Sequence, residues 1–179
     1  MNDTPILTPA VSERDHSQGP ADAPITLVEY GDYQCPYCGA AYPVVKRLQA
    51  DLGKKLRFVF RNFPLTQMHP LAMVSAEAAE AAGRLGKFWQ MHDVIFENQQ
   101  WLDVEGLARW AHQLGLGDEQ LEKALKRPEI AKRIEEDHRS GIRSGVNGTP
   151  TFYINGQRYD GSPDYKSLLA ALESELAVR

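Results

Sequence analysis

The chain has 179 residues, of which 42% are hydrophobic and 25% are charged, and its formal net charge is −4. This composition is ordinary for a globular domain, and it lacks the excess of Lys and Arg that a nucleic-acid-binding protein needs. No stretch approaches the roughly 18 consecutive apolar residues of a membrane-spanning helix. We therefore expect a globular chain with no nucleic-acid partner and no transmembrane segment.

The first twenty residues differ in composition from the rest. Residues 1–20 are polar and rich in Pro, Ser and acidic side chains. They lack the basic start and the apolar run of a secretory signal, which predicts a cytoplasmic location, or an exported one if a signal has been removed. We interpret residues 1–20 as a flexible polar leader and residues 21–179 as one domain.

After the leader, the β-branched and apolar run 24–30 predicts a buried strand. A turn then leads into a helix that we expect from Cys35 to about Asp51, with Pro43 kinking its axis. Residues 56–63 alternate between apolar and polar, which predicts a second strand. A strand, a helix and a strand in this order favour a parallel right-handed crossover.

The middle of the chain, from residue 70 to about residue 145, has apolar residues at helical spacing and predicts a block of several helices. Residues 151–154 and 157–159 then flank Asn155-Gly156, a strong hairpin signal because Asn-Gly supplies the positive φ angles of a tight turn. A final amphipathic helix follows. The order βαβ, a helical insertion at about 65–145, and ββα predicts an α/β fold with a mixed sheet.

The two cysteines of the chain, Cys35 and Cys38, are three positions apart at the start of the first helix. A disulfide across so short a loop removes little entropy from the unfolded chain, so it is a poor staple. The unpaired N–H groups of a helix N-terminus lower the pKa of a thiol placed there, and Cys35 is the outer of the two. This predicts thiol–disulfide exchange in which Cys35 reacts first and Cys38, one turn further in, resolves the mixed disulfide.

A Cys-x-x-Cys pair is also half of a structural zinc site. The second half would need further ligands, and the five histidines have no compact ligand spacing. We therefore expect no metal site.

Three segments together carry a resemblance to a known family. VEYGDYQCPYC, Pro43 in the following helix and NGTPTFYINGQ resemble the DsbA-like branch of the thioredoxin superfamily, over nearly the whole chain from about residue 22 to residue 178. The resemblance implies a thioredoxin fold with a helical insertion. It also implies that Cys35 is the exposed nucleophile and Cys38 the resolving cysteine.

The resemblance assigns further residues of the site. Pro150 is expected to be a cis-proline that packs against the active-site disulfide, and Thr149 to present backbone groups to an extended substrate peptide. Glu29 matches the buried acid of the family, whose role would be to exchange a proton with Cys38. From the residues alone, Glu29 as a solvent-exposed acid on an edge strand stays an alternative.

The two residues between the cysteines, Pro36 and Tyr37, would tune the site. The best-known oxidases of the family have His in the place of Tyr37, and a tyrosine offers no cation to stabilise a thiolate. Tyr33, Phe63 and Met68 are candidates to line a groove with Tyr37 beside Cys35.

The resemblance implies cysteine-containing proteins as substrates, and a redox recycling partner or glutathione. We expect no cofactor other than the redox-active cysteine pair, with glutathione as a candidate co-substrate. Two other classes stay open: a redox-silent peptide-binding or chaperone module, and a glutathione-dependent transferase or isomerase of the same fold. The direction of electron flow, oxidase or reductase, is open as well.

Overall fold

The computed structural model describes residues 5–178. Its centre is a five-stranded sheet in the order β1-β3-β2-β4-β5. β2 and β3 are parallel, and the other neighbouring strands are antiparallel. The strands are β1 (His16–Gln18), β2 (Ile25–Gly31), β3 (Leu56–Asn62), β4 (Thr151–Ile154) and β5 (Gln157–Tyr159). The mixed sheet and the parallel pairing of the first two predicted strands are therefore confirmed.

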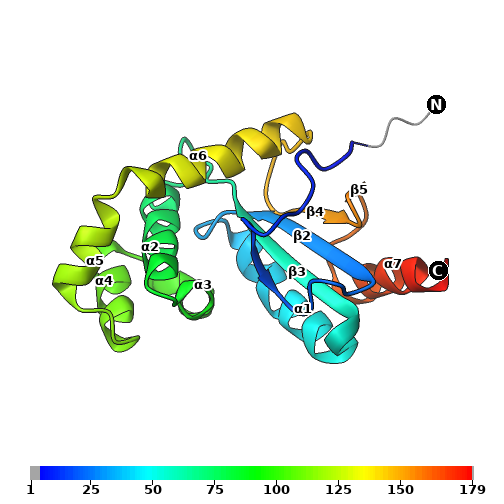
Figure 1. The fold of residues 1–179 in the computed structure, drawn as a ribbon, viewed down its shortest axis with the longest axis horizontal. Coiled ribbons are helices and arrows are strands. Elements are labelled where there is room, and N and C mark those ends of the chain that lie inside the picture. Colours follow the sequence, from blue (N-terminus) through cyan, green and yellow to red (C-terminus); the bar gives the residue numbers. More distant parts are fainter. Residues whose placement is uncertain (1–4, 179) are drawn as a thin grey trace.

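The helices cover the sheet in two groups (Figure 1). α1 and α7 pack together beneath the sheet, whereas α6 crosses its other side next to β3. α2, α3, α4 and α5 form a lobe beside the sheet, so the helical insertion lies between β3 and β4 as predicted. The helices are α1 (Pro36–Leu52), α2 (Ala72–Arg84), α3 (Phe88–Glu97), α4 (Val104–Gln113), α5 (Asp118–Leu125), α6 (Pro128–Arg143) and α7 (Tyr165–Ala177), with short 3-10 turns at Gly53–Lys55 and Gln99–Trp101.

Alternation along the strands divides the core into two layers. One face of β2 and β3 packs against α1 and α7 through Ile25, Leu27, Phe58 and Phe60. The opposite face belongs to a second cluster, which contains Val28, Tyr30 and Val59 together with Leu7 of the N-terminal segment. Because side chains alternate, the next positions of these strands also point to opposite faces: Glu29 toward α1, and Arg61 away from it.

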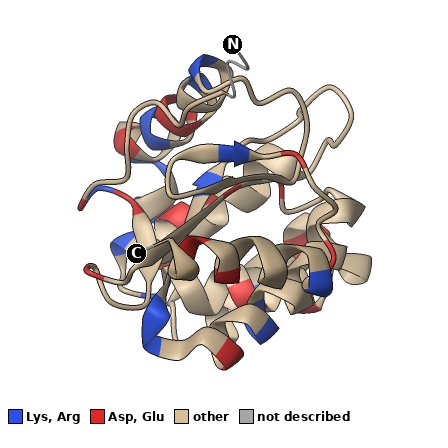
Figure 2. Ribbon diagram, turned by 90° about the vertical axis from the view of Figure 1, so that its right-hand side faces the viewer, with Lys and Arg blue, Asp and Glu red and all other residues tan. Residues whose placement is uncertain are grey.

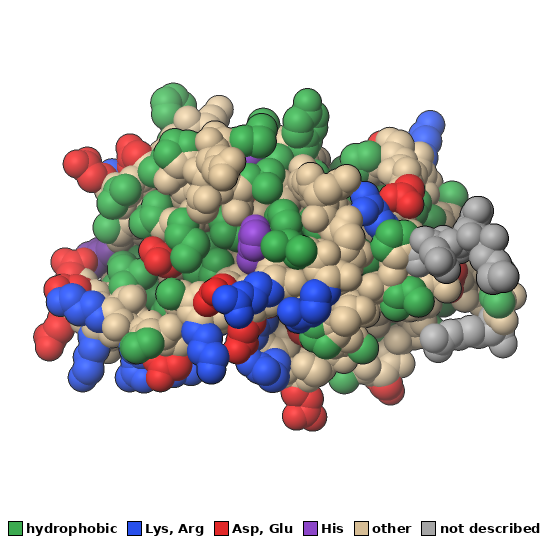
Figure 3. Space-filling model, turned by 90° about the horizontal axis from the view of Figure 1, so that it is seen from above, with side chains coloured by type: hydrophobic (Ala, Val, Ile, Leu, Met, Phe, Trp, Pro, Cys, Tyr) green, Lys and Arg blue, Asp and Glu red, His purple; other side chains and the backbone are tan. Residues whose placement is uncertain are grey.

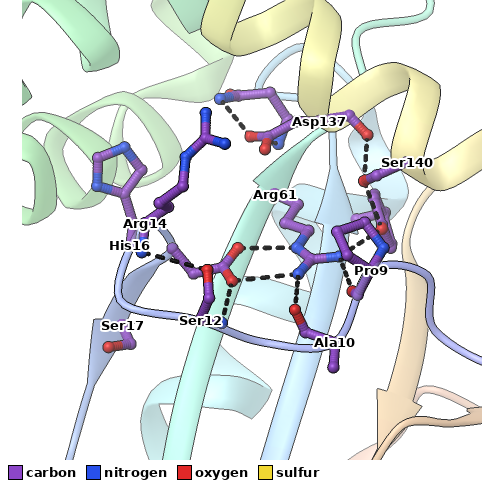
Figure 4. Close-up of polar contacts among 12 residues, drawn as sticks. Pro9, Ala10, Ser12, Arg14, His16, Ser17, Arg61, Asp137 and Ser140 are labelled. Atoms are coloured by element: carbon purple, nitrogen blue, oxygen red, sulfur yellow. Dashed lines mark hydrogen bonds and ion pairs between the residues drawn. The ribbon is translucent and has the colours of Figure 1, made fainter.

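The prediction that residues 1–20 form a flexible leader is wrong for the part that the structure describes; residues 1–4 lie outside it. Leu7 is buried, and its N–H donates to the Gly156 carbonyl at 2.8 Å. β1 pairs with β3 at the edge of the sheet. Arg61 binds Asp15 through two hydrogen bonds of 2.8 and 3.1 Å and also donates to the carbonyls of Pro9 and Ala10 (Figure 4). The acidic side chain of Asp15 in this polar segment is thus the partner of a buried arginine.

The second half of the fold follows the predicted hairpin. Asn155 and Gly156 have φ angles of 48° and 85°, the left-handed backbone that the tight turn between β4 and β5 requires. The hairpin places β4 beside β2, in register from Leu27 opposite Ile154 to Tyr30 opposite Thr151. The residues just before β4 are thereby brought to the end of β2, where the two cysteines lie.

The surface carries charges of both signs. In the view of Figure 2, acidic and basic residues are interspersed on the helices. Seen from above, hydrophobic side chains gather over the middle of the face, and Lys and Arg side chains cluster along one side (Figure 3). Among residues 5–178, no helix is both long enough and apolar enough to cross a membrane.

Candidate active site

The two cysteines are placed by the junction of β2 and α1. After β2 ends at Gly31, a short turn leads to Cys35, which is the N-cap residue of α1. Pro36 occupies the first helical position, where the missing N–H costs nothing. Cys38 lies one turn further in and is completely buried. Both cysteines are free thiols in this structure.

The helical insertion braces this junction from outside. The side-chain amide of Gln99 donates to the carbonyl of Tyr33 at 2.9 Å and to that of Cys35 at 2.8 Å. Gly39 leaves room for this contact, because a Cβ at this position would lie 2.1 Å from the Gln99 Oε1. The turn around Cys35 is therefore fixed by a residue 64 positions away.

The surroundings of the two sulfurs shift their pKa values in opposite directions. The hydrogen bond from the Cys38 thiol is the largest influence on Cys35, and together with Thr149 and the backbone N–H groups of Tyr37 and Cys38 it lowers the pKa of Cys35 to about 5, although burial opposes it. Burial raises the pKa of Cys38 well above that of an ordinary thiol, and Cys35 and Glu29 raise it further. The direction of the shift at Cys35 is the one that its position at the N-terminus of α1 predicts.

The prediction that Cys35 is exposed is wrong, while its role as the nucleophile stays a prediction. Only 3% of Cys35 is exposed, against 0% of Cys38. The reason is the loop before β4, because the Cys35 Sγ lies against it and donates to the Thr149 carbonyl at 3.4 Å. Any reacting partner must reach the sulfur along this loop.

Glu29 lies in the middle of the sheet, since β2 pairs with both β3 and β4. It is 3% exposed, so the alternative of a solvated acid on an edge strand is wrong. Burial and the neighbouring Cys35 raise the pKa of Glu29 to about 8. Its Oε1 has no hydrogen-bond partner among residues 5–178. A buried carboxyl that is easily protonated thus lies on the α1 side of the sheet, where its negative charge raises the pKa of Cys38.

The loop before β4 carries the other predicted residues. The peptide bond between Thr149 and Pro150 is cis, as predicted. The loop is held by Thr151, whose hydroxyl donates to the Gly148 carbonyl at 2.7 Å. The buried hydroxyl of Thr149 forms no hydrogen bond within the described part of the chain, but it lies near enough to Cys35 to help lower the pKa of that thiol. Thr149 and Pro150 therefore lie where the prediction places them, beside Cys35, while their role toward a substrate stays a prediction.

The prediction of a groove beside Cys35 is wrong for Tyr33 and Phe63, and for Tyr37 and Met68 it stays a prediction. Tyr37 and Met68 are each 73% exposed and present apolar surface. Tyr33 and Phe63 are instead buried in the core. Buried Tyr33 bonds His92 at 3.0 Å, so it serves the packing of α3 against the sheet and lines no open surface.

Asp32, Gln34 and His69 are three residues near the site that sequence reasoning missed. Asp32 and Gln34, in the turn before Cys35, both reach to the connection between β3 and α2. Asp32 Oδ2 accepts hydrogen bonds from the backbone N–H of Leu65 at 2.9 Å and from Nδ1 of His69 at 2.8 Å. Gln34 Oε1 accepts from the backbone N–H of Leu71 at 2.6 Å. The only available signal was the presence of two polar residues in the turn that leads to the first cysteine.

A Cys-x-x-Cys pair at the start of α1, a cis-proline loop before β4 and a helical insertion between β3 and β4 together match the DsbA-like class of thioredoxin-fold thiol–disulfide oxidoreductases. Residues 11–174 match the model of the family described as thioredoxin, and the chain belongs to this family.

Solved structures of this class superpose on nearly the whole chain. A thioredoxin-like oxidoreductase from Silicibacter pomeroyi DSS-3 is 26% identical with a TM-score of 0.80, covering 94% of this chain and 95% of its own. BdbD from Bacillus subtilis, in its oxidised form, is 26% identical with a TM-score of 0.80, covering 98% and 100%. The alpha-DsbA1 protein of Wolbachia pipientis is 20% identical with a TM-score of 0.80 and 94% coverage of both chains, and it shows the shared fold.

Curated relatives carry a different name. The Na(+)/H(+) antiporter NhaA 1 of Salinispora arenicola is 45% identical over 172 residues, which are 96% of this chain but 26% of the antiporter. The chain thus spans about a quarter of the length of the curated relatives it matches.

Proposed function

We propose that this chain catalyses thiol–disulfide exchange with cysteine-containing proteins through Cys35 and Cys38. The observation that carries the proposal is the difference between the two sulfurs: the pKa of Cys35 is lowered to about 5, whereas that of buried Cys38 is raised. At neutral pH one sulfur is therefore a thiolate, the form that attacks disulfides, and the other is a protonated thiol held in reserve.

The exchange would run in two balanced steps. The Cys35 thiolate attacks a disulfide of the partner, forms a mixed disulfide and releases one partner thiolate. Cys38 then loses its proton and attacks the Cys35 Sγ, which releases the second partner thiolate and closes the Cys35–Cys38 bond. Two electrons pass to the partner, and the reverse sequence oxidises a partner dithiol.

Glu29 would accept the Cys38 proton in the second step. Its pKa of about 8 means that it both takes up and releases protons near neutral pH. Its Oε1 has no competing hydrogen bond within residues 5–178, which leaves an acceptor on the face of the sheet that α1 covers.

The low pKa of Cys35 supports the oxidising direction. A pKa of about 5 lies between the values of about 7 for thioredoxin and about 3.5 for DsbA. A stabilised thiolate favours the reduced enzyme, which makes the disulfide form a stronger oxidant. We infer a reduction potential between about −270 and −120 mV, and an oxidising compartment outside the cytoplasm as the place of work. A redox partner or glutathione would recycle the pair.

The surroundings of Cys35 favour an extended polypeptide as substrate. Thr149 and Pro150 precede β4 and would present backbone groups to the substrate chain. The exposed apolar side chains of Tyr37 and Met68 would contact its side chains. Tyr37 would thus act through binding, since the lowered pKa of Cys35 arises from Cys38, Thr149 and the backbone.

The antiporter relatives suggest a setting for this activity. Their name describes proteins about four times as long as this chain, and the matched segment is the part that belongs to the thioredoxin family here. We infer that the shared segment is a redox domain, so the chain would share with these relatives thiol–disulfide exchange rather than ion transport.

The test compares the parent protein with Cys35→Ser and Cys38→Ser in the oxidation of a reduced, unfolded protein substrate, with the potential measured in glutathione buffers. Cys35→Ser should lose at least about a thousandfold in rate, and Cys38→Ser should accumulate the mixed disulfide. Full activity of Cys35→Ser would instead support the redox-silent peptide-binding module. Full glutathione-dependent activity of Cys38→Ser would support the transferase or isomerase.

A further inference from the structure

Asp32 is the most fully bonded residue of the turn that precedes Cys35. Its carbonyl accepts from the backbone N–H of Cys35 at 3.1 Å, and its Oδ1 accepts from the backbone N–H of Gln34 at 2.8 Å. The second oxygen, Oδ2, reaches across to the β3–α2 connection, where it meets Leu65 and His69. These bonds fix both the backbone and the side chain of Asp32, which is fully buried.

The remaining polar group of Asp32 points at the resolving cysteine. Its backbone N–H donates to the Cys38 Sγ at 3.5 Å. A hydrogen bond of this kind is stronger to a thiolate than to a thiol, so it opposes the influences that keep Cys38 protonated. The position of Asp32 therefore bears on the step in which Cys38 must lose its proton.

His69 is the only side chain that bonds the Asp32 carboxylate within residues 5–178. Its Nδ1 lies 2.8 Å from Oδ2, and the imidazole is 15% exposed on its outer side. The backbone N–H of His69 bonds the Leu65 carbonyl at 2.8 Å, so the ring is held within the same loop that supplies the Leu65 N–H. Replacing this side chain removes one of the two hydrogen bonds to Oδ2 and leaves the partners of Oδ1 and of the Asp32 carbonyl unchanged.

We propose that Asp32 and His69 are positioning residues for Cys38: His69 holds the Asp32 carboxylate, and Asp32 thereby holds its N–H on the Cys38 sulfur during resolution. This inference rests on the proposed thiol–disulfide exchange. It assigns a role in that chemistry to the helical insertion, because the loop that carries His69 leads into α2.

The test separates the two sulfurs with 5,5′-dithiobis(2-nitrobenzoate), a small aromatic disulfide. The Cys35 thiolate breaks its disulfide and releases one nitrothiobenzoate anion, and the Cys38 thiolate then attacks the Cys35 Sγ of the mixed disulfide and releases a second. Starting from the Cys35 thiolate and the Cys38 thiol, the protein loses two electrons and one proton, and the reagent gains the two electrons. Stopped-flow absorbance resolves both releases as a function of pH.

His69→Leu should leave the first release within about twofold of the parent, slow the second about tenfold, and move its pH midpoint up by about one unit. The ionisable groups that act on Cys38, Glu29 and Cys35, are unchanged in this variant. His69→Asn, whose amide replaces the Nδ1 donor, should restore the second release. If His69→Leu does not fold, Asp32→Asn removes one of the two acceptor oxygens of this side chain and should slow the second release in the same way.

The matched control is His16→Leu. His16 bonds Glu80 at 2.9 Å and likewise ties the helical insertion to the sheet, with no contact to either cysteine among the described residues. It should slow neither release. Three results would overturn the inference: His69→Leu leaves the second release unchanged, His16→Leu slows it equally, or His69→Asn does not restore it. Absence of the first release from the parent protein would overturn the proposed function itself, and the inference with it.

Discussion

Glu29 and Arg61 are buried ionisable residues on neighbouring strands, and they point to opposite faces of the same sheet. On the Arg61 side every N–H of the guanidinium has a partner: Asp15 accepts two at 2.8 and 3.1 Å, Tyr30 accepts one at 2.9 Å, and the Pro9 and Ala10 carbonyls accept the others. On the Glu29 side, Oε1 has no partner within residues 5–178.

This difference indicates a structural role for Arg61 and a chemical role for Glu29. Pairing with Arg61 lowers the pKa of Asp15, although burial acts against this shift. The ionised pair therefore stabilises the fold at pH values above the ordinary pKa of an Asp, and this stabilisation is lost as the pH falls through the lowered pKa. The pKa of Glu29 is raised, so its ionisation destabilises the fold as the pH rises. The fully paired charge of Arg61 holds the N-terminal segment against the sheet. A buried acid with a raised pKa beside two cysteines, as Glu29 is, is typical of a functional site.

The largest effect is expected from Arg61→Met. It leaves the Asp15 carboxylate buried without its partner, and breaking such a pair costs about 3–5 kcal/mol in the free energy of unfolding. Urea unfolding at pH 7 measures the loss, with Arg57→Met as control, since Arg57 lies on the same strand and forms no ion pair within the described residues. The control should lose less than about 1 kcal/mol. Equal losses in the two variants would contradict the structural role of the Arg61 network.

The opposite sign is expected from Glu29→Gln. Between the ordinary pKa of 4.5 and the folded value of about 8, the native protein binds more protons at this site than the unfolded chain, so stability falls as the pH rises. Removing the acid should therefore raise the free energy of unfolding by up to about 3 kcal/mol at pH 7, and by little at pH 4.

The same variant should slow the closure of the Cys35–Cys38 bond by about a hundredfold or more, because the proton acceptor is lost. Unfolding curves at several pH values and the rate of disulfide closure check the two effects. A stability that is unchanged at pH 7 would show that Glu29 is not held in an unfavourable environment.

The smallest effect is expected from Thr149→Val, which keeps the size of the side chain and removes the hydroxyl that helps to lower the pKa of Cys35. The pKa of Cys35 should rise by less than about one unit, and the reduction potential should fall by less than about 30 mV. Thr151→Val is the control, because the Thr151 hydroxyl bonds the Gly148 carbonyl instead. A larger shift in the control than in Thr149→Val would contradict the assignment.

The parts of the fold that sequence predicts well are those with local signals. The hairpin follows from Asn155-Gly156, and the start of α1 from Cys35-Pro36, since in each case the backbone preference lies within a few residues. The contacts that sequence misses join distant positions. Arg61 meets Asp15 across 46 positions, and His69 meets Asp32 across 37.

Composition misleads where polar residues serve a buried partner. In the sequence, Asp15 is one of several charged residues in a polar segment, and only the fold shows that it pairs with Arg61. The low exposure of Cys35 is likewise invisible from its neighbours in sequence, because Thr149, 114 positions away, covers it. Local preferences thus predict the elements and the cysteine chemistry, while burial and pairing depend on the assembled sheet.

The proposed exchange requires Cys35 to be a thiolate and Cys38 a thiol at neutral pH. The most direct test is the rate at which iodoacetamide alkylates the reduced protein as a function of pH, with the modified residue identified by peptide mass analysis. If Cys35 is the thiolate, it alone reacts, with a midpoint near pH 5. Alkylation with the midpoint of an ordinary thiol, about 8.5, or equal modification of both cysteines, would contradict it.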